Sequence, residues 1–243
     1  MLEVEALTKL YGDRPAVQGL TFGVGAGEIM GLVGPNGAGK TTTLRCMSGI
    51  LPMTSGRVSV SGHDLQSQPL QTKAVLAFVP DEPALFDYLT VEEHLRFTAR
   101  LYRQPDDADR RVALLEQFQL VAKRDALANE LSRGMKQKLT LACAIIHDPL
   151  LLLMDEPLTG LDPVGIRQVK DLLINRARAG AGIILSSHQL PLIDEICTRL
   201  LFLHRGRVVA SGTREELARA HPEADGLEAI FLAVTADGGP AAE

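Results

Sequence analysis

A glycine-rich segment near residue 34 has the residue types and spacing of a phosphate-binding loop. The sequence Gly-Pro-Asn-Gly-Ala-Gly-Lys-Thr over residues 34–41 matches the pattern GxxxxGK(S/T), follows an apolar run and opens a helical stretch. Glycines let successive backbone N–H groups point at phosphate oxygens, and a helix N-terminus adds the positive end of its dipole. We expect Lys40 to bind the β- and γ-phosphates and Thr41 to offer its hydroxyl to Mg²⁺. The candidate loop residues are Gly34, Pro35, Asn36, Gly37, Ala38, Gly39, Lys40, Thr41 and Thr42.

Two adjacent carboxylates follow a second apolar run. Residues 150–154 are all apolar and lead directly into Asp155 and Glu156. A carboxylate at the end of a central strand can hold Mg²⁺ through water, and the next side chain faces the opposite way. Asp155 is therefore the predicted metal residue, and Glu156 is the predicted general base for the attacking water. Alone, the pair would equally fit a solvated strand end, but the phosphate-binding loop favours the catalytic interpretation.

The elements that position these residues alternate between strands and helices. Apolar and β-branched runs predict strands at residues 2–7, 16–24, 28–33, 57–60, 74–79, 150–154, 182–186, 200–204 and 207–210. Helical patterns are predicted at residues 40–50, 111–119, 123–128, 132–147, 164–179 and 190–197, together with a helix that begins at a capping box from Thr90 to Glu93. Because strands and helices alternate in the second half, the pattern predicts a parallel sheet.

Composition limits the classes of function. Apolar residues make up 46% of the 243 residues, enough for a real core, and the net charge of −5 without a basic run argues against a nucleic-acid partner. The most apolar segment, residues 139–154, is interrupted by His147, Asp148 and Pro149 and is too short and polar to span a bilayer. Residues 1–10 carry charges where an export signal needs an apolar stretch, so we expect a cytoplasmic protein.

The three cysteines show no pattern of a metal or redox site. Cys46, Cys143 and Cys197 are far apart, lie in apolar helical stretches and form no CxxC motif or Cys/His cluster. We therefore expect buried thiols.

From about residue 2 to residue 212, the chain resembles ATP-binding-cassette ATPases. The diagnostic segment is Leu-Ser-Arg-Gly-Met at residues 131–135, which is similar to the family signature LSGGQ and lies upstream of Asp155. The resemblance implies an α/β P-loop NTPase core, with a mixed, mainly parallel sheet flanked by helices, an N-terminal antiparallel β region and an inserted α-helical subdomain. It assigns residues 1–83 and 136–212 to the core, 84–135 to the insert, and 213–243 to a C-terminal helical extension and tail. Residues 235–243 are small and polar, so we expect this tail to be disordered. ATP and Mg²⁺ are the implied cofactors.

The resemblance also assigns roles to residues that would be ordinary by themselves. Ser132 and Gly134 would face the γ-phosphate of an ATP held by the opposite subunit. Tyr11 would stack on adenine, Asp162 would lie in a loop across the dimer interface, and His188 would sense the γ-phosphate.

Two departures from the family pattern stand out. Asp81 occupies the place where the family usually has glutamine, and an aspartate only accepts hydrogen bonds. It would either help to hold Mg²⁺ or be a simple turn residue between two prolines. Arg133 and Met135 replace glycine and glutamine of the signature. These variants, together with residues 227–232, resemble exporter-type cassettes.

The implied partners are a second nucleotide-binding subunit and an integral-membrane permease subunit. Two chains would sandwich two ATPs head to tail, and their opening and closing would drive the permease. This would place the chain peripherally on the cytoplasmic face of the membrane. The apolar cluster Leu85, Phe86, Tyr88 and Leu89 would be either the docking site or part of the core of the insert.

Two other functions are compatible with parts of the sequence. One is a soluble cassette ATPase acting in translation or DNA repair, although such proteins generally carry two cassettes, a coiled-coil insertion or zinc-binding cysteines. The other is a nucleotide-binding regulatory module with little turnover, a possibility that Asp81 and Met135 raise. The presence of Lys40, Asp155, Glu156 and His188 argues for hydrolysis.

Overall fold

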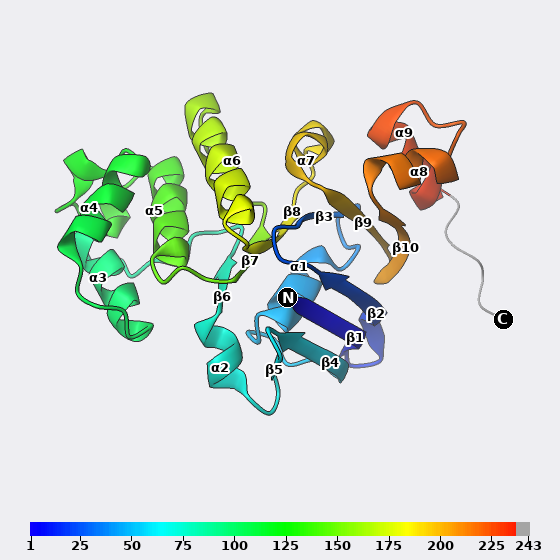
Figure 1. The fold of residues 1–243 in the computed structure, drawn as a ribbon, viewed down its shortest axis with the longest axis horizontal. Coiled ribbons are helices and arrows are strands. Elements are labelled where there is room, and N and C mark those ends of the chain that lie inside the picture. The colour runs from blue at the N-terminus through cyan, green and yellow to red at the C-terminus, as the bar shows by residue number, and fades with distance from the viewer. Residues whose placement is uncertain (237–243) are drawn as a thin grey trace.

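The computed structural model describes residues 1–236 and confirms the predicted α/β architecture (Figure 1). A six-stranded sheet has the order β10 (Arg207–Gly212), β9 (Arg199–His204), β3 (Ile29–Val33), β8 (Gly182–Ser186), β7 (Leu151–Asp155) and β6 (Leu76–Val79). All its neighbouring strands are parallel except β10 and β9, which form the predicted hairpin. A four-stranded antiparallel sheet has the order β2 (Arg14–Val24), β1 (Leu2–Tyr11), β4 (Ser55–Val60) and β5 (His63–Asp64).

Both faces of the central strands β3, β7 and β8 are buried, which explains why these strands are almost entirely apolar. In β7, Leu151 and Leu153 pack into one hydrophobic cluster while Leu152 and Met154 pack into the other. The first cluster also contains α1 (Lys40–Met47) and the inner face of the antiparallel sheet. Helix α1 is thus covered on two sides by strands, and the phosphate-binding loop at its N-terminus has a rigid support.

Helices cover the opposite face of the parallel sheet. They are α5 (Arg133–Ile145), α6 (Pro163–Arg178), α7 (Leu190–Ile196) and α9 (Gly226–Ala236), and α8 (Arg214–Ala220) packs beside α9. Figure 1 shows α3 (Val91–Leu101) and α4 (Ala108–Gln117) with α5 at one end of the molecule, and α8 with α9 at the other. Within residues 1–236, the structure contains no helix long and apolar enough to cross a membrane.

The predicted capping box at the start of α3 is confirmed. The Thr90 hydroxyl accepts a hydrogen bond from the backbone N–H of Glu93 at 3.2 Å, and the Glu93 carboxylate accepts one from the N–H of Thr90 at 2.8 Å. Two N–H groups that the helix cannot satisfy by itself are therefore paired.

The helix predicted at residues 123–128 is wrong. The chain forms two 3₁₀ turns, Val121–Lys123 and Ala128–Glu130, and the segment between them pairs with the start of α3. The carbonyl oxygens of Ala126 and Arg124 accept hydrogen bonds from the N–H groups of Val91 and Glu92. Because these carbonyls accept hydrogen bonds from α3, they are not paired with N–H groups four residues later, as an α-helix over residues 123–128 would require.

Several predicted helix and strand ends differ from the structure by a few residues, and one short helix was not predicted. Helix α2 (Pro69–Ala74) was not predicted, so the strand expected from residue 74 begins at Leu76. Helix α1 ends at Met47 instead of residue 50, because Gly49 adopts a left-handed conformation with φ of 70°. The tail was expected to be disordered from residue 235, but Thr235 and Ala236 belong to α9, and residues 237–243 lie outside the described part.

All three cysteines are free thiols; Cys46 is buried as expected, whereas Cys143 and Cys197 are partly exposed. Burial raises the pKa of Cys46 to about 11 and the pKa values of Cys143 and Cys197 to about 12. They therefore stay protonated and unreactive at neutral pH.

Candidate functional site

A cavity of about 270 Å³ lies where the carboxyl ends of β3, β6 and β7 meet. It is lined by Ala16, Asn36, Gly37, Ala38, Gly39, Lys40, Thr41, Thr42, Asp81, Asp155 and Glu156. The fold therefore brings together most of the predicted loop residues, both predicted carboxylates and Asp81. The crevice at the carboxyl ends of parallel strands is where open α/β sheets usually bind ligands.

The phosphate-binding loop is tightly enclosed, and this explains two of its glycines. Gly39 has φ of 104°, and a Cβ atom there would lie 2.6 Å from the carbonyl oxygen of Ala16. A Cβ atom on Gly34 would lie 2.9 Å from the Cβ of Ala38. The loop is also held from outside, because the N–H of Gly206, in the β9–β10 turn, donates to the Ala38 carbonyl at 2.9 Å.

Lys40 extends its ammonium group back over the loop. Its Nζ donates to the carbonyl oxygens of Gly34 at 2.6 Å and Pro35 at 3.2 Å, and the residue is only 8% exposed. Burial lowers the pKa of Lys40, while the nearby charges of Glu156 and Asp155 act in the opposite direction. A buried cation held only by backbone carbonyls is suited to exchange them for the oxygens of an anionic ligand.

Asp155 ends β7 and is almost completely buried. Its Oδ1 accepts a hydrogen bond from the Ser186 hydroxyl at 2.6 Å, and the same hydroxyl accepts one from the backbone N–H of Glu156 at 3.1 Å. Ser186 ends the neighbouring strand β8 and pairs with Asp155 in the sheet register. Ser186 therefore holds the Asp155 carboxylate and the backbone of Glu156. No sequence pattern indicates this role, because the pairing of β7 with β8 is what brings Ser186 to Asp155.

Glu156 turns sharply out of the strand. Its φ of 48° is left-handed, a conformation that costs a non-glycine residue on the order of 1–3 kcal/mol. The turn brings its carboxylate to the cavity, where Oε2 lies 2.9 Å from Nδ1 of His188. Burial raises the pKa of Glu156, and the charges of His188 and Lys40 offset part of that rise. A partly desolvated carboxylate in contact with an imidazole can accept a proton from water.

Asp81 is exposed and follows β6 in a turn at the cavity wall. Within residues 1–236 there is no cluster of three or more His, Cys, Asp or Glu side chains that would hold a metal alone. A cation in this cavity would instead use the Thr41 hydroxyl, one or two carboxylates, phosphate oxygens and water. Hard oxygen ligands of this kind, few of them from the protein, suit Mg²⁺.

Seven of the predicted site residues do not line the cavity: Tyr11, Gly34, Pro35, Ser132, Gly134, Asp162 and His188. Tyr11 lies at the end of β1, 55% exposed, with the Lys9 ammonium 5.4 Å from its ring centre. Ser132 caps α5 by accepting from the Met135 N–H at 3.3 Å, and Gly134 lies in the first turn of this helix. Asp162 caps α6 in the same way, with the Gly165 N–H at 2.8 Å.

An apolar groove of about 440 Å³ lies between α3, α5 and the end of β6. Phe86 lines it at 56% exposure and packs edge-on against Phe97, with ring centres 5.4 Å apart. His94 holds this loop, because its Nε2 accepts from the backbone N–H of Phe86 at 3.0 Å. The apolar cluster is thus divided: Leu85 packs against the core, whereas Phe86 and Tyr88 are exposed.

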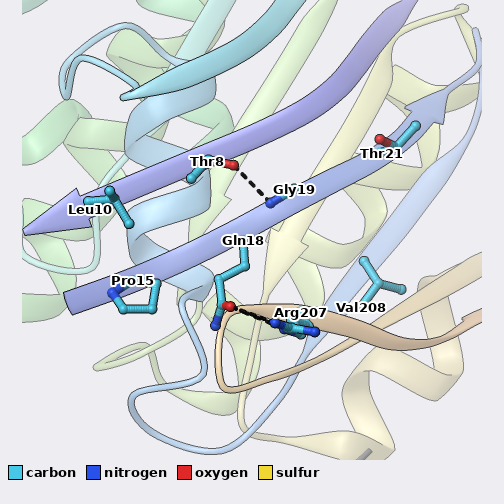
Figure 2. A pocket seen from close by; sticks show the side chains of 8 residues that line it. All are labelled: Thr8, Leu10, Pro15, Gln18, Gly19, Thr21, Arg207 and Val208. Carbon is cyan, nitrogen blue, oxygen red and sulfur yellow. Dashed lines mark hydrogen bonds between the residues drawn. The ribbon is translucent and has the colours of Figure 1, made fainter. Parts of the chain in front are cut away.

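A larger hollow, of about 670 Å³, lies over β1, β2 and β10 (Figure 2). Its polar groups already have partners: the Thr8 hydroxyl accepts from the Gly19 N–H at 3.0 Å, and Gln18 accepts from Arg207. None of the predicted site residues lines it. The smaller cavity, which carries the chemistry, is therefore the candidate site.

A phosphate-binding loop and two carboxylates at the carboxyl ends of parallel strands define a P-loop nucleoside triphosphatase. Residues 17–159 match the sequence model of the family described as ABC transporter. The chain is 32% identical to the ABC-type transporter ATP-binding protein EcsA of Bacillus subtilis (strain 168), over 97% of this chain and 96% of that protein. It is 38% identical to the Nod factor export ATP-binding protein I of Neorhizobium galegae, over 87% of this chain and 61% of that protein.

A solved structure described as the ATP binding subunit of an ABC transporter has a TM-score of 0.91 and 34% sequence identity to this chain, and the match covers 96% of this chain and 99% of that one. The chain belongs to the ABC transporter family and is one of its ATP-binding, ATP-hydrolysing proteins.

Proposed function

We propose that this chain hydrolyses ATP with Glu156 as general base and thereby powers export through a membrane permease subunit. The observation that carries the chemistry is the contact between Glu156 and His188 at the wall of the cavity that also contains Lys40 and Asp155. The direction of transport rests on the relative whose name describes Nod factor export and on the signature variants at Arg133 and Met135.

Each side chain then has one task. The loop N–H groups and Lys40 bind the β- and γ-phosphates, and Lys40 gives up its bonds to the loop carbonyls when ATP arrives. Thr41 and Asp155, with Asp81 beside them, would hold Mg²⁺, whose charge would offset the negative charge of the phosphates. Glu156 takes the proton of the attacking water. His188 fixes the Glu156 carboxylate and responds to loss of the γ-phosphate.

We further propose that two chains complete each ATP site. Ser132 and Gly134 start a helix whose free N–H groups suit an anion, yet they lie outside the cavity of their own chain. A second nucleotide-binding subunit, placed head to tail, would bring this helix start to the γ-phosphate and Asp162 to the interface. Tyr11, next to the cavity wall at Ala16 on the β1–β2 hairpin, would stack on adenine.

The permease would dock in the apolar groove beside α3. The exposed rings of Phe86 and Tyr88 offer apolar area, and the bond from Phe86 to His94 keeps the loop in place. Because residues 81–86 connect the nucleotide cavity to this groove, docking and hydrolysis share one short segment. Docking would hold the chain on the cytoplasmic face of the membrane.

The proposed organisation has residues 1–83 and 136–212 as the ATP-binding core, 84–135 as the inserted helical subdomain and 213–243 as a C-terminal extension. The bridge between Thr90 and Leu127 supports this division, because it closes the insert on itself. The boundary after residue 135 falls within α5, so this helix would belong to both parts.

The deciding experiment is Glu156→Gln, with exposed Glu223→Gln as the control. We expect ATP binding to persist and hydrolysis to fall by a factor on the order of 10² or more, since a positioned base contributes ~10²–10⁴. Size-exclusion chromatography with ATP and Mg²⁺ should show a trapped dimer of the mutant. A monomer that hydrolyses ATP at the wild-type rate would show that Glu156 is not the base. A wild-type chain that binds ATP without turnover would instead point to a regulatory module.

A further inference from the structure

Gln137 is a buried glutamine whose amide reaches the loop that carries Glu156. It lies in α5 and is only 1% exposed. Its Nε2 donates to the carbonyl oxygen of Pro157 at 3.0 Å. Pro157 directly follows Glu156 and has no N–H, so this carbonyl is its one backbone group available for anchoring.

The backbone of Glu156 is therefore held from two sides. Its own N–H bonds Ser186 of β8, at 3.2 Å to the carbonyl and 3.1 Å to the hydroxyl, while Gln137 of α5 holds the next carbonyl. The left-handed φ of 48° at Glu156 persists only if the surroundings enforce it. The hydrogen bonds from Ser186 and Gln137 hold the backbone in this conformation.

Only one end of the Gln137 amide is hydrogen-bonded, so a glutamine is not the most stabilising residue for this position. Its Oε1 is buried and has no hydrogen-bond partner among residues 1–236. An unpaired buried polar atom lowers the stability of the fold, a penalty that an apolar side chain of the same volume would avoid. A role in holding the Pro157 carbonyl gives a reason for a glutamine at this position.

We propose that Gln137 is a positioning residue for Glu156, and that through it α5 links the two half-sites of one chain. This inference rests on the proposed role of Glu156 as base. The same helix begins at Ser132 and Gly134, which we placed against the ATP of the opposite subunit. Gln137 thus connects α5, whose start would complete the ATP site of the partner chain, to Glu156, the base in the ATP site of its own chain.

A close contact reinforces the link. A Cβ atom on Gly134 would lie only 2.8 Å from the carbonyl oxygen of Gly160, so the start of α5 and the loop after Glu156 touch through their backbones. When nucleotide in the partner's site moves α5, the loop that carries the base moves with it.

The first test is Gln137→Met, which keeps the volume and removes the donor. Glutamine on α6 offers a matched control, Gln168→Met, outside the site. We expect kcat for ATP to fall on the order of 10-fold, because a small misplacement of a base costs up to ~10², while KM and the melting temperature change little. A purely structural role would lower the melting temperature instead. Unchanged kcat overturns the proposal.

A double-mutant cycle separates this inference from the proposed base. If Gln137 acts through Glu156, then Gln137→Met should cause no further loss of the residual single-turnover rate in the Glu156→Gln protein. An equal fold loss in both backgrounds would show that Gln137 acts elsewhere. If Glu156→Gln alone hydrolyses normally, the base assignment has failed, whatever Gln137 does.

A second variant distinguishes loss of the hydrogen bond from disturbed packing around residue 137. Gln137→Glu has the same shape, and its carboxyl can donate to Pro157 only when it is protonated. Relative to wild type, its kcat should therefore fall as pH rises, whereas the ratio for Gln137→Met should stay constant. A pH-independent ratio for the glutamate variant contradicts the hydrogen-bond role.

Discussion

Lys40 is a buried cation whose ammonium group lies beside the carbonyl oxygens of the phosphate-binding loop. Removing the ammonium deletes two hydrogen bonds to the loop and every ionic contact to phosphate. We predict that Lys40→Ala weakens ATP binding by about 10–100-fold, because a charge-assisted hydrogen bond contributes about 1.5–3 kcal/mol. The protein should remain folded. Nucleotide titration and a melting curve test this, with exposed Lys73→Ala as the control. Unchanged affinity would remove the phosphate-loop interpretation.

Asp81 is the residue of the cavity that departs most from the family pattern. If it helps to hold Mg²⁺, then Asp81→Asn should raise the Mg²⁺ concentration needed for half-maximal hydrolysis more than it changes ATP affinity. A carboxylate attracts the hard cation but repels phosphate, whereas an amide does neither strongly. Asp81→Gln should behave like a typical cassette. We would measure the ATPase rate against Mg²⁺ for all three proteins; one shared midpoint would make Asp81 a turn residue.

Among the elements, the capping box of α3 is the clearest case in which local sequence fixes local structure. Thr90→Ala removes the acceptor for the Glu93 N–H, and we predict a loss of about 1 kcal/mol in the free energy of unfolding. Thr90→Ser keeps the hydroxyl and should lose only a few tenths. Urea unfolding followed by circular dichroism gives both values. Equal stability of the alanine variant would mean that tertiary contacts, not the cap, start this helix.

Elements governed by local pattern were predictable, and those governed by distant partners were not. The buried strands β3, β7 and β8 follow from apolar runs of the right length, and the loop glycines from their motif. The prediction of a helix at residues 123–128 is wrong because the carbonyls of Arg124 and Ala126 accept hydrogen bonds from the start of α3, an arrangement that no local pattern encodes. Ser186 and Gln137 were missed for the same reason: each reaches the Glu156 loop only after the sheet or α5 has packed.

For the whole molecule, the junction between the inserted helices and the core contains a buried histidine. His147 stacks on Tyr102, with ring centres 3.6 Å apart, and its Nε2 lies 3.3 Å from the carbonyl oxygen of Leu76. Burial lowers the pKa of His147 to about 4. Its value in the unfolded chain is about 6.5, so the unfolded state takes up the proton first. This part of the stability is complete above about pH 6.5 and is lost as pH falls toward 4.

We therefore predict that wild type loses up to about 3 kcal/mol more stability between pH 7 and pH 4 than His147→Phe, which keeps a ring against Tyr102. Urea unfolding at both pH values measures the difference. Parallel pH dependence in the two proteins would show that His147 is not the source of acid sensitivity.

The position of β3 in the middle of the parallel sheet has a consequence for biosynthesis. Its two neighbours are β8 and β9, and the loop that follows it is held by Gly206, so its partners are the late strands of the chain. Contacts between segments so distant in sequence form slowly and cannot form before both segments exist. A ribosome-bound fragment that ends before Arg199 contains the whole phosphate-loop sequence yet lacks a neighbour of β3. We therefore expect the nascent chain to bind nucleotide only after β9 has been synthesised.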